Sequence, residues 1–213
     1  MNKERSGAFM DAVIAIVMTI LVLELEKPAE PTLEAFWDLR VNFAAYAITF
    51  LWLASMWSCL HNAWHVVDKV SGRTIWLSIG LLFFSSLFPY ATSLLADYFD
   101  SGVVQGFYAL IVIATMIMLY LIHKSLAKDD GRPETVAYMN HICNLMMVSV
   151  GMMIVGAVLG MFVWTPLVTI GLLAAAVILT TRRKLKGTHE PSSEEEASAE
   201  GSSSEEGDSS ANG

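Results

Sequence analysis

The chain has 213 residues, of which 54% are hydrophobic and only 16% are charged, and its mean hydropathy is +0.52. Soluble globular domains are about 45–50% apolar and about 25% charged, so this composition argues against a soluble enzyme and a nucleic-acid-binding protein. The net charge of −8 comes from the C-terminal end, because residues 187–213 hold eight acidic residues and no lysine or arginine. Residues 1–186 are left with 13 acidic and 13 basic residues. A membrane protein with an acidic tail is the first interpretation.

Six apolar segments follow one another along residues 1–186, and we expect each to form a transmembrane helix. They span approximately residues 7–25, 41–67, 74–98, 103–123, 138–163 and 166–181. A helix needs about 20 mostly apolar residues to cross a bilayer. The second to fifth segments reach that length, whereas the first and the last are short. The sequence therefore predicts an all-α, polytopic membrane domain over 1–186 with six transmembrane helices.

The basic residues lie in alternate connections between these segments. Eleven of the 13 precede the first segment, separate the second from the third or the fourth from the fifth, or follow the sixth. By the positive-inside rule, both termini are expected in the cytoplasm of a multi-pass protein of the cell (plasma) membrane. Residues 187–213, which are rich in serine and glutamate, are expected to be a disordered cytoplasmic tail.

The first segment is unusual because it combines apolar residues with Arg5, Asp11 and Thr19. Its start resembles a signal peptide, but Asp11 interrupts the apolar run and no small-residue cleavage site follows, so we expect a retained helix. Ionisable groups in spanning helices usually face the bundle interior or water. One face of this helix, away from Asp11, carries an apolar stripe at helical spacing: Phe9, Ile16, Ile20 and Leu23. Periodicity alone favours ordinary helix–helix packing for this stripe.

Polar residues on the second and fifth segments are expected at the same depth as Asp11. They are His61, Asn62 and His65 on the second segment, and Asn140, His141 and Asn144 on the fifth. We expect a buried polar network that positions the first helix, since an unpaired buried charge is costly. A metal site built from His61, His65 and His141 is a weaker alternative, because the i, i+4 pair suits zinc but lacks a clear third ligand. Proton sensing by His61 is another alternative.

The first segment also carries a family resemblance. Arg5-x-x-x-Phe9-Met10-Asp11, followed by an apolar run to Thr19 and the acidic Glu24, resembles the first-helix signature of prokaryotic relatives of transmembrane protein 175, an endosomal and lysosomal potassium channel. Two further stretches resemble the same family: the Trp57 and His61 pair, and Leu87-Phe88-Pro89-Tyr90-Ala91-Thr92. Met10 departs from the signature, which has serine there, so a hydroxyl is lost from the polar cluster.

The resemblance implies a homotetrameric potassium channel whose central pore is lined by the first helix. By position, Ile16 would form the constriction, Ile20 and Leu23 further apolar rings, and Thr19 a hydroxyl layer. The sequence has no T-V-G-Y-G filter, so a modest preference for potassium over sodium is expected. The pore helix would be held by a polar network with these members: Arg5, Phe9, Asp11, His61 and Asn144.

The expected partners are further copies of the chain, the lipid bilayer and permeant potassium ions, with no nucleic acid, cofactor or resident metal. A secondary transporter is an alternative, although it would be expected to show inverted repeats and ionisable groups near the midplane. A proton-permeable channel is another. A membrane enzyme would need a catalytic constellation that only the histidines could offer, so no enzymatic activity is expected. A regulatory membrane subunit is compatible with the same sequence.

Overall fold

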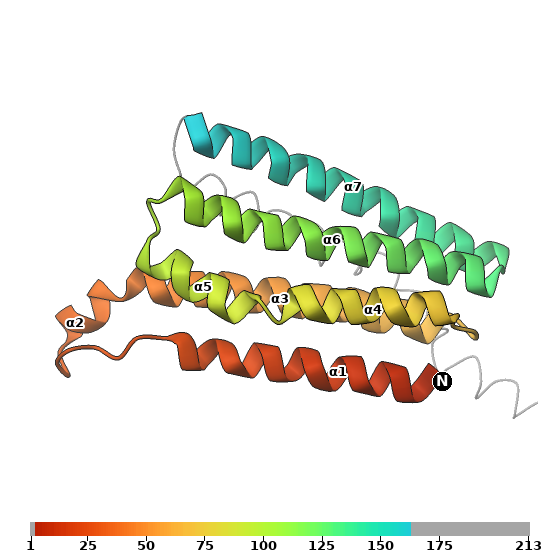
Figure 1. Ribbon diagram of the computed structural model, residues 1–213, viewed down its shortest axis with the longest axis horizontal. Coiled ribbons are helices and arrows are strands. Elements are labelled where there is room, and N and C mark those ends of the chain that lie inside the picture. Colours follow the sequence, from red (N-terminus) through yellow and green to blue (C-terminus); the bar gives the residue numbers. More distant parts are fainter. Residues whose placement is uncertain (1–2, 163–213) are drawn as a thin grey trace, which may run out of the picture. The chain divides into compact units, whose positions relative to one another are not determined.

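A computed structural model describes residues 3–162, with side chains described to residue 152. This part of the chain folds as long helices lying side by side, with α1 at one edge and α7 at the other (Figure 1). The helices are α1 (Lys3–Ile20), η1 (Leu21–Glu24, a 3-10 helix), α2 (Leu33–Asp38), α3 (Arg40–Val66), α4 (Gly72–Ser85), α5 (Phe88–Asp97), α6 (Gly102–Asp130) and α7 (Pro133–Phe162). The all-α prediction is confirmed for the described residues.

Four stretches within residues 3–162 are long and apolar enough to cross a membrane: Lys3–Glu24, Arg40–Val66, Gly72–Asp97 and Gly102–Asp130. They correspond to the first four predicted segments. The fifth predicted segment is found as α7, and the sixth, together with the tail at 187–213, lies outside the described residues. The structure thus supports a membrane protein with several apolar helices.

The third predicted segment is interrupted, which the hydropathy pattern did not predict. α4 ends at Ser85 and α5 begins at Phe88, with Pro89 in its first turn. Proline has no backbone N–H and its ring collides with the carbonyl four residues earlier, so a continuous helix is disfavoured here. The N–H of Leu87 instead donates to the carbonyl of Phe84, three residues back, at 3.2 Å.

Helix ends also differ from the predicted segments. α6 continues seven residues beyond 123, to Asp130, and ends at Gly131, whose φ of +71° provides a left-handed cap. The short helix α2 was not predicted. It is capped at its start by the Thr32 hydroxyl, which accepts a hydrogen bond from the N–H of Ala35 at 3.3 Å.

The core lies between α1, α3, α4, α5 and α6. α1 packs on α3, α4 and α5, while α6 packs on α4, α5 and α7. The largest fully buried side chains include Trp52, Leu53 and Met56 of α3, Phe88 of α5, and Leu119 and Ile122 of α6. α1 is thus fixed along one side, and its other side is not covered by the described part of the chain.

The two ends of this helical unit carry different charges. One end gathers the start of α1, the end of α3, the start of α4, the end of α6 and the start of α7 (Figure 1). We call it the basic end, because seven of the nine basic residues in 3–162 lie there: Lys3, Arg5, Lys69, Arg73, Lys124, Lys128 and Arg132. At the opposite end, Lys27 and Arg40 are outnumbered by acidic residues: Glu24, Glu26, Glu30, Glu34, Asp38, Asp97 and Asp100.

Candidate functional site

α1 has one face inside the subunit and one outside it. The buried face consists of Ser6, Met10, Ile14 and Val17, and continues to Leu21 of η1. The exposed ridge consists of Phe9, Ile16, Thr19, Ile20 and Leu23. Ile16 is 56% exposed and Leu23 is 77% exposed, whereas Ile14 is fully buried. Within one chain, therefore, the predicted apolar stripe does not pack against the described helices, and it is available to lipid, water or another subunit.

Thr19 adds a polar group to the exposed ridge. Its Oγ1 donates a hydrogen bond to the backbone carbonyl of Ile16 at 2.8 Å. This bond satisfies the hydroxyl proton inside the helix, while the oxygen keeps acceptor capacity. A hydroxyl in this state can offer oxygen to a cation without first breaking a helix hydrogen bond.

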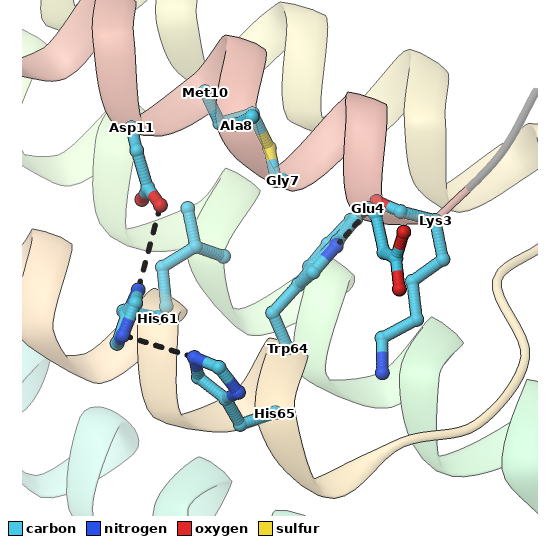
Figure 2. A pocket seen from close by; sticks show the side chains of 10 residues that line it. Lys3, Glu4, Gly7, Ala8, Met10, Asp11, His61, Trp64 and His65 are labelled. Carbon is cyan, nitrogen blue, oxygen red and sulfur yellow. Dashed lines mark hydrogen bonds and ion pairs between the residues drawn. The ribbon is translucent and has the colours of Figure 1, made fainter.

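Asp11 connects α1 to α3 at the basic end. Its Oδ1 accepts a hydrogen bond from Nε1 of Trp57 at 2.8 Å, and its Oδ2 lies 3.5 Å from Nδ1 of His61. The Nε2 atoms of His61 and His65 are 3.0 Å apart, so three side chains form a continuous line from Asp11 to His65 (Figure 2). Asp11 and His61 are partly exposed, at 42% and 36%. This line holds α1 to α3 by polar contacts beside the apolar ones.

A cavity of about 420 Å³ opens between α1 and α3 at this end. Asp11, His61 and His65 line it together with Lys3 and Glu4 (Figure 2). The start of α1 is tied down at the rim, because Nε1 of Trp64 donates to the carbonyl of Lys3 at 3.3 Å and the Lys3 ammonium donates to the carbonyl of Val67. The cavity walls are thus fixed on both helices.

The structure brings together only some of the residues predicted to form the polar network. Asp11 and His61 meet as described, whereas Arg5 is exposed on α1 and Phe9 lies on the exposed ridge. Asn144 is exposed on α7, at the opposite edge from α1 in Figure 1. The predicted link from α1 to the fifth segment is therefore not made by Asn144 within one described chain. Neighbouring Asn140 instead accepts a hydrogen bond from Nζ of Lys124 on α6 at 2.9 Å.

The sequence interpretation missed two features of this site. The sequence interpretation used Trp57 only in the family resemblance, but its Nε1 donates the 2.8 Å hydrogen bond to Oδ1 of Asp11. The spacing of Trp57 and His61, four residues apart on one helical face, was the available signal. Met10, in the position of the signature serine, is 4% exposed and extends the buried apolar face of α1. The lost hydroxyl is thus replaced by core packing.

These features define an α-helical membrane protein with an uncovered apolar ridge on its first helix. The family model for the endosomal/lysosomal potassium channel TMEM175 matches residues 5–89. These residues include the first-helix signature, the Trp57 and His61 pair and the first part of the Leu87–Thr92 stretch. The resemblance to the TMEM175 family is therefore confirmed.

Three curated proteins, each named as a potassium channel, are similar to this chain. The protein from Chryseobacterium sp. (strain P1-3) is 38% identical over 92 residues, which cover 43% of this chain and 48% of its own. The protein from Streptomyces collinus is 29% identical over 123 residues, which cover 54% of this chain and 60% of its own. The protein from Chamaesiphon minutus is 28% identical over 135 residues, which cover 59% of this chain and 66% of its own. The match thus spans about half to two thirds of the length of these relatives.

A solved structure has the same fold. It is described as the crystal structure of a lysosomal potassium-selective channel TMEM175 homolog from Chamaesiphon minutus. The TM-score is 0.66 at 24% sequence identity, and the match covers 84% of this chain and 97% of the solved chain. At this identity, the likeness establishes the fold.

Proposed function

We propose that this chain is the subunit of a potassium channel in the plasma membrane, a homotetramer with α1 of each copy around a central pore. The observation that carries the proposal is the exposed ridge of α1. The similarity to proteins named potassium channels supports the choice of ion. A helix held on one side by its own subunit and uncovered on the other is suited to line a path between copies.

In this proposal, Ile16, Ile20 and Leu23 form successive apolar rings, of which Ile16 is the constriction. Isoleucine side chains cannot replace the water around an ion, so a narrow ring closes the path by excluding water. The ring must widen to pass a partly hydrated ion. Hydroxyl oxygens from Thr19 then compensate part of the lost hydration, which gives a modest preference for potassium over sodium.

Charge at the ends of the helices supports cation transport. The basic end faces the cytoplasm by the positive-inside rule, so the end rich in carboxylates faces outward. A surface of one sign raises the local concentration of counter-ions. Exposed acidic residues at the outer mouth would therefore enrich potassium where it enters.

Potassium flux into liposomes that contain the purified protein tests the proposal. Ile16→Asn should increase the flux because a polar ring no longer excludes water, and Thr19→Ala should lower the ratio of potassium to sodium flux. Ile117→Asn is the matched control, since Ile117 is 47% exposed but lies on α6. Unchanged flux and selectivity in both α1 variants would count against the proposal.

The same liposomes distinguish potassium conduction from the alternatives. A trapped pH dye reports proton movement, and an imposed membrane potential drives a channel without any second substrate. A potassium channel should give a flux that follows the potential and needs no proton gradient. Flux that requires a proton gradient would favour a transporter, and dye signals without potassium flux would favour a proton-permeable channel.

A further inference from the structure

We propose that His61 and His65 form a binding site for a divalent transition-metal ion, with zinc as the probe, on the wall of the cavity between α1 and α3. The two imidazoles stand one helical turn apart on α3 and direct their Nε2 atoms at each other, 3.0 Å apart (Figure 2). Imidazole nitrogen is a preferred ligand for zinc, copper and nickel. The site is separate from the exposed ridge of α1.

The spacing of the two nitrogens is close to what an ion needs. Two zinc–nitrogen bonds of about 2.0–2.1 Å at a tetrahedral angle place the nitrogens roughly 3.3 Å apart. A change of a few tenths of an ångström from the observed 3.0 Å lies within reach of small side-chain rotations. His65 is exposed on the cavity wall, so an ion reaches the pair without unfolding either helix.

Asp11 prepares His61 for this role. The Asp11 carboxylate already accepts a hydrogen bond from Trp57 at 2.8 Å, and it lies 3.5 Å from Nδ1 of His61. When a carboxylate oxygen of Asp11 accepts a hydrogen bond from Nδ1 of His61, the lone pair on Nε2 of His61 is left available to an ion. Carboxylates hold many zinc-binding histidines in this way. The ion then meets a free lone pair on the His61 side.

The remaining coordination positions belong to water. Within residues 3–162, no group of three or more histidine, cysteine or acidic side chains is placed to hold one ion. The cavity of about 420 Å³ has room for bound water, and Glu4 on its wall contributes negative charge. Structural zinc sites are almost always closed by four protein ligands, whereas two histidines leave positions open to water, which suits a regulatory site better than a structural one.

Binding would also act on α1. His61 and His65 belong to α3, and Asp11 belongs to α1. An ion on Nε2 draws electron density from His61 and strengthens its Nδ1–H contact with Asp11, which fastens α1 to α3. This second part rests on the proposed function: a more tightly held α1 should slow the widening of the Ile16 ring and reduce potassium flux.

Isothermal titration of the full-length protein in detergent with zinc chloride tests the site. His65→Ala should weaken the tightest zinc-binding step at least tenfold, whereas His141→Ala, which removes an exposed histidine on α7, should leave it unchanged. Electron paramagnetic resonance with Cu²⁺ should show two nitrogen ligands in the unaltered protein and one in His65→Ala. Equal zinc affinity in the unaltered protein and His65→Ala, or no zinc binding at all, would overturn the site.

Zinc added to the liposome assay tests the action on α1 separately. Flux should fall with zinc in the unaltered protein and stay constant in His65→Ala. Intact zinc binding with zinc-insensitive flux would overturn the link to α1 and leave the site standing. Intact binding in a protein that passes no potassium would instead overturn the proposed channel function. Circular dichroism of each variant establishes that the helical fold is retained.

Discussion

Gly7 allows the start of α1 to approach α3 closely. A Cβ atom at this position would lie 3.0 Å from Cδ1 and 3.1 Å from Nε1 of Trp64, closer than ordinary contact distance. The Trp64 ring is held there by its hydrogen bond to the carbonyl of Lys3. A small residue is therefore required at this crossing, as is common where membrane helices touch.

We predict that Gly7→Ala lowers the thermal unfolding midpoint of the protein in detergent. Overpacking of a close contact costs about 1–3 kcal/mol, and the Trp64 ring must move away from Lys3. Gly106→Ala is the control, because a Cβ on α6 at Gly106 meets nothing within 4 Å and alanine favours the helix. Equal midpoints for Gly7→Ala and the unaltered protein would contradict the close approach.

The contact between Trp57 and Asp11 gives a second prediction at this scale. Trp57→Phe keeps most of the ring but removes the N–H that donates to Oδ1 of Asp11 at 2.8 Å. A hydrogen bond to a charged group contributes about 1.5–3 kcal/mol, so the unfolding midpoint should fall. Trp76→Phe serves as control, since Trp76 is 74% exposed. A larger loss for Trp76→Phe than for Trp57→Phe would refute the assigned role.

His61 and Asn144 were both predicted to lie at the depth of Asp11, but only His61 contacts it in the structure. Comparing helices that run in opposite directions gives the expected depth of a side chain, and it assigned the same depth to His61 and Asp11, which lie 3.5 Å apart. Depth says nothing of which side of the bundle a residue lies on. Asn144 has a similar predicted depth, yet it lies on α7, which packs on α6. Which of the two residues contacts Asp11 depends on which helices pack side by side, and hydropathy does not encode that order.

At the scale of the element, α1 has one face in the subunit core and another in the exposed ridge that we propose lines the pore. Ile14 and Ile16 are two residues apart on the same helix, but Ile14 is fully buried and Ile16 is 56% exposed. The first belongs to the core of the subunit. The second belongs to the ridge assigned to the pore.

We predict that Ile14→Ala and Ile16→Ala have opposite signatures. Truncation of a buried isoleucine costs about 2–5 kcal/mol, so Ile14→Ala should lower the unfolding midpoint. Ile16→Ala should leave the stability of the subunit nearly unchanged and should alter potassium flux by widening the ring. Thermal unfolding and liposome flux on both variants check this. Strong destabilisation by Ile16→Ala would mean that this side chain is buried in the working protein.

Element boundaries show what hydropathy alone can supply. Apolar runs correctly located the second and fourth predicted helices, because the hydrophobic length of a span is set by the bilayer. They missed the interruption between Ser85 and Phe88, which depends on Pro89. They also ended the fourth helix too early, since Lys124 and Lys128 continue α6 as polar helical turns up to the cap at Gly131.

At the scale of the whole molecule, the charge difference between the two ends predicts orientation. Lys69 lies at the basic end and Asp100 at the opposite end, and both residues are exposed. Each can therefore be replaced by cysteine as a site for labelling. In intact cells, a membrane-impermeant maleimide should label Asp100→Cys and not Lys69→Cys. The natural Cys59 and Cys143 are buried, so they give little background. Labelling of Lys69→Cys alone would place the basic end outside the cell.

The central claim is that the exposed ridge of α1 faces an ion path between subunits. Thiol modification of Ile16→Cys in the liposome flux assay tests it most directly, with Ile117→Cys on α6 as the matched control. A positively charged methanethiosulfonate reagent should reduce potassium flux through Ile16→Cys and leave flux through Ile117→Cys unchanged. Unaltered flux through a fully modified Ile16→Cys protein would contradict the claim.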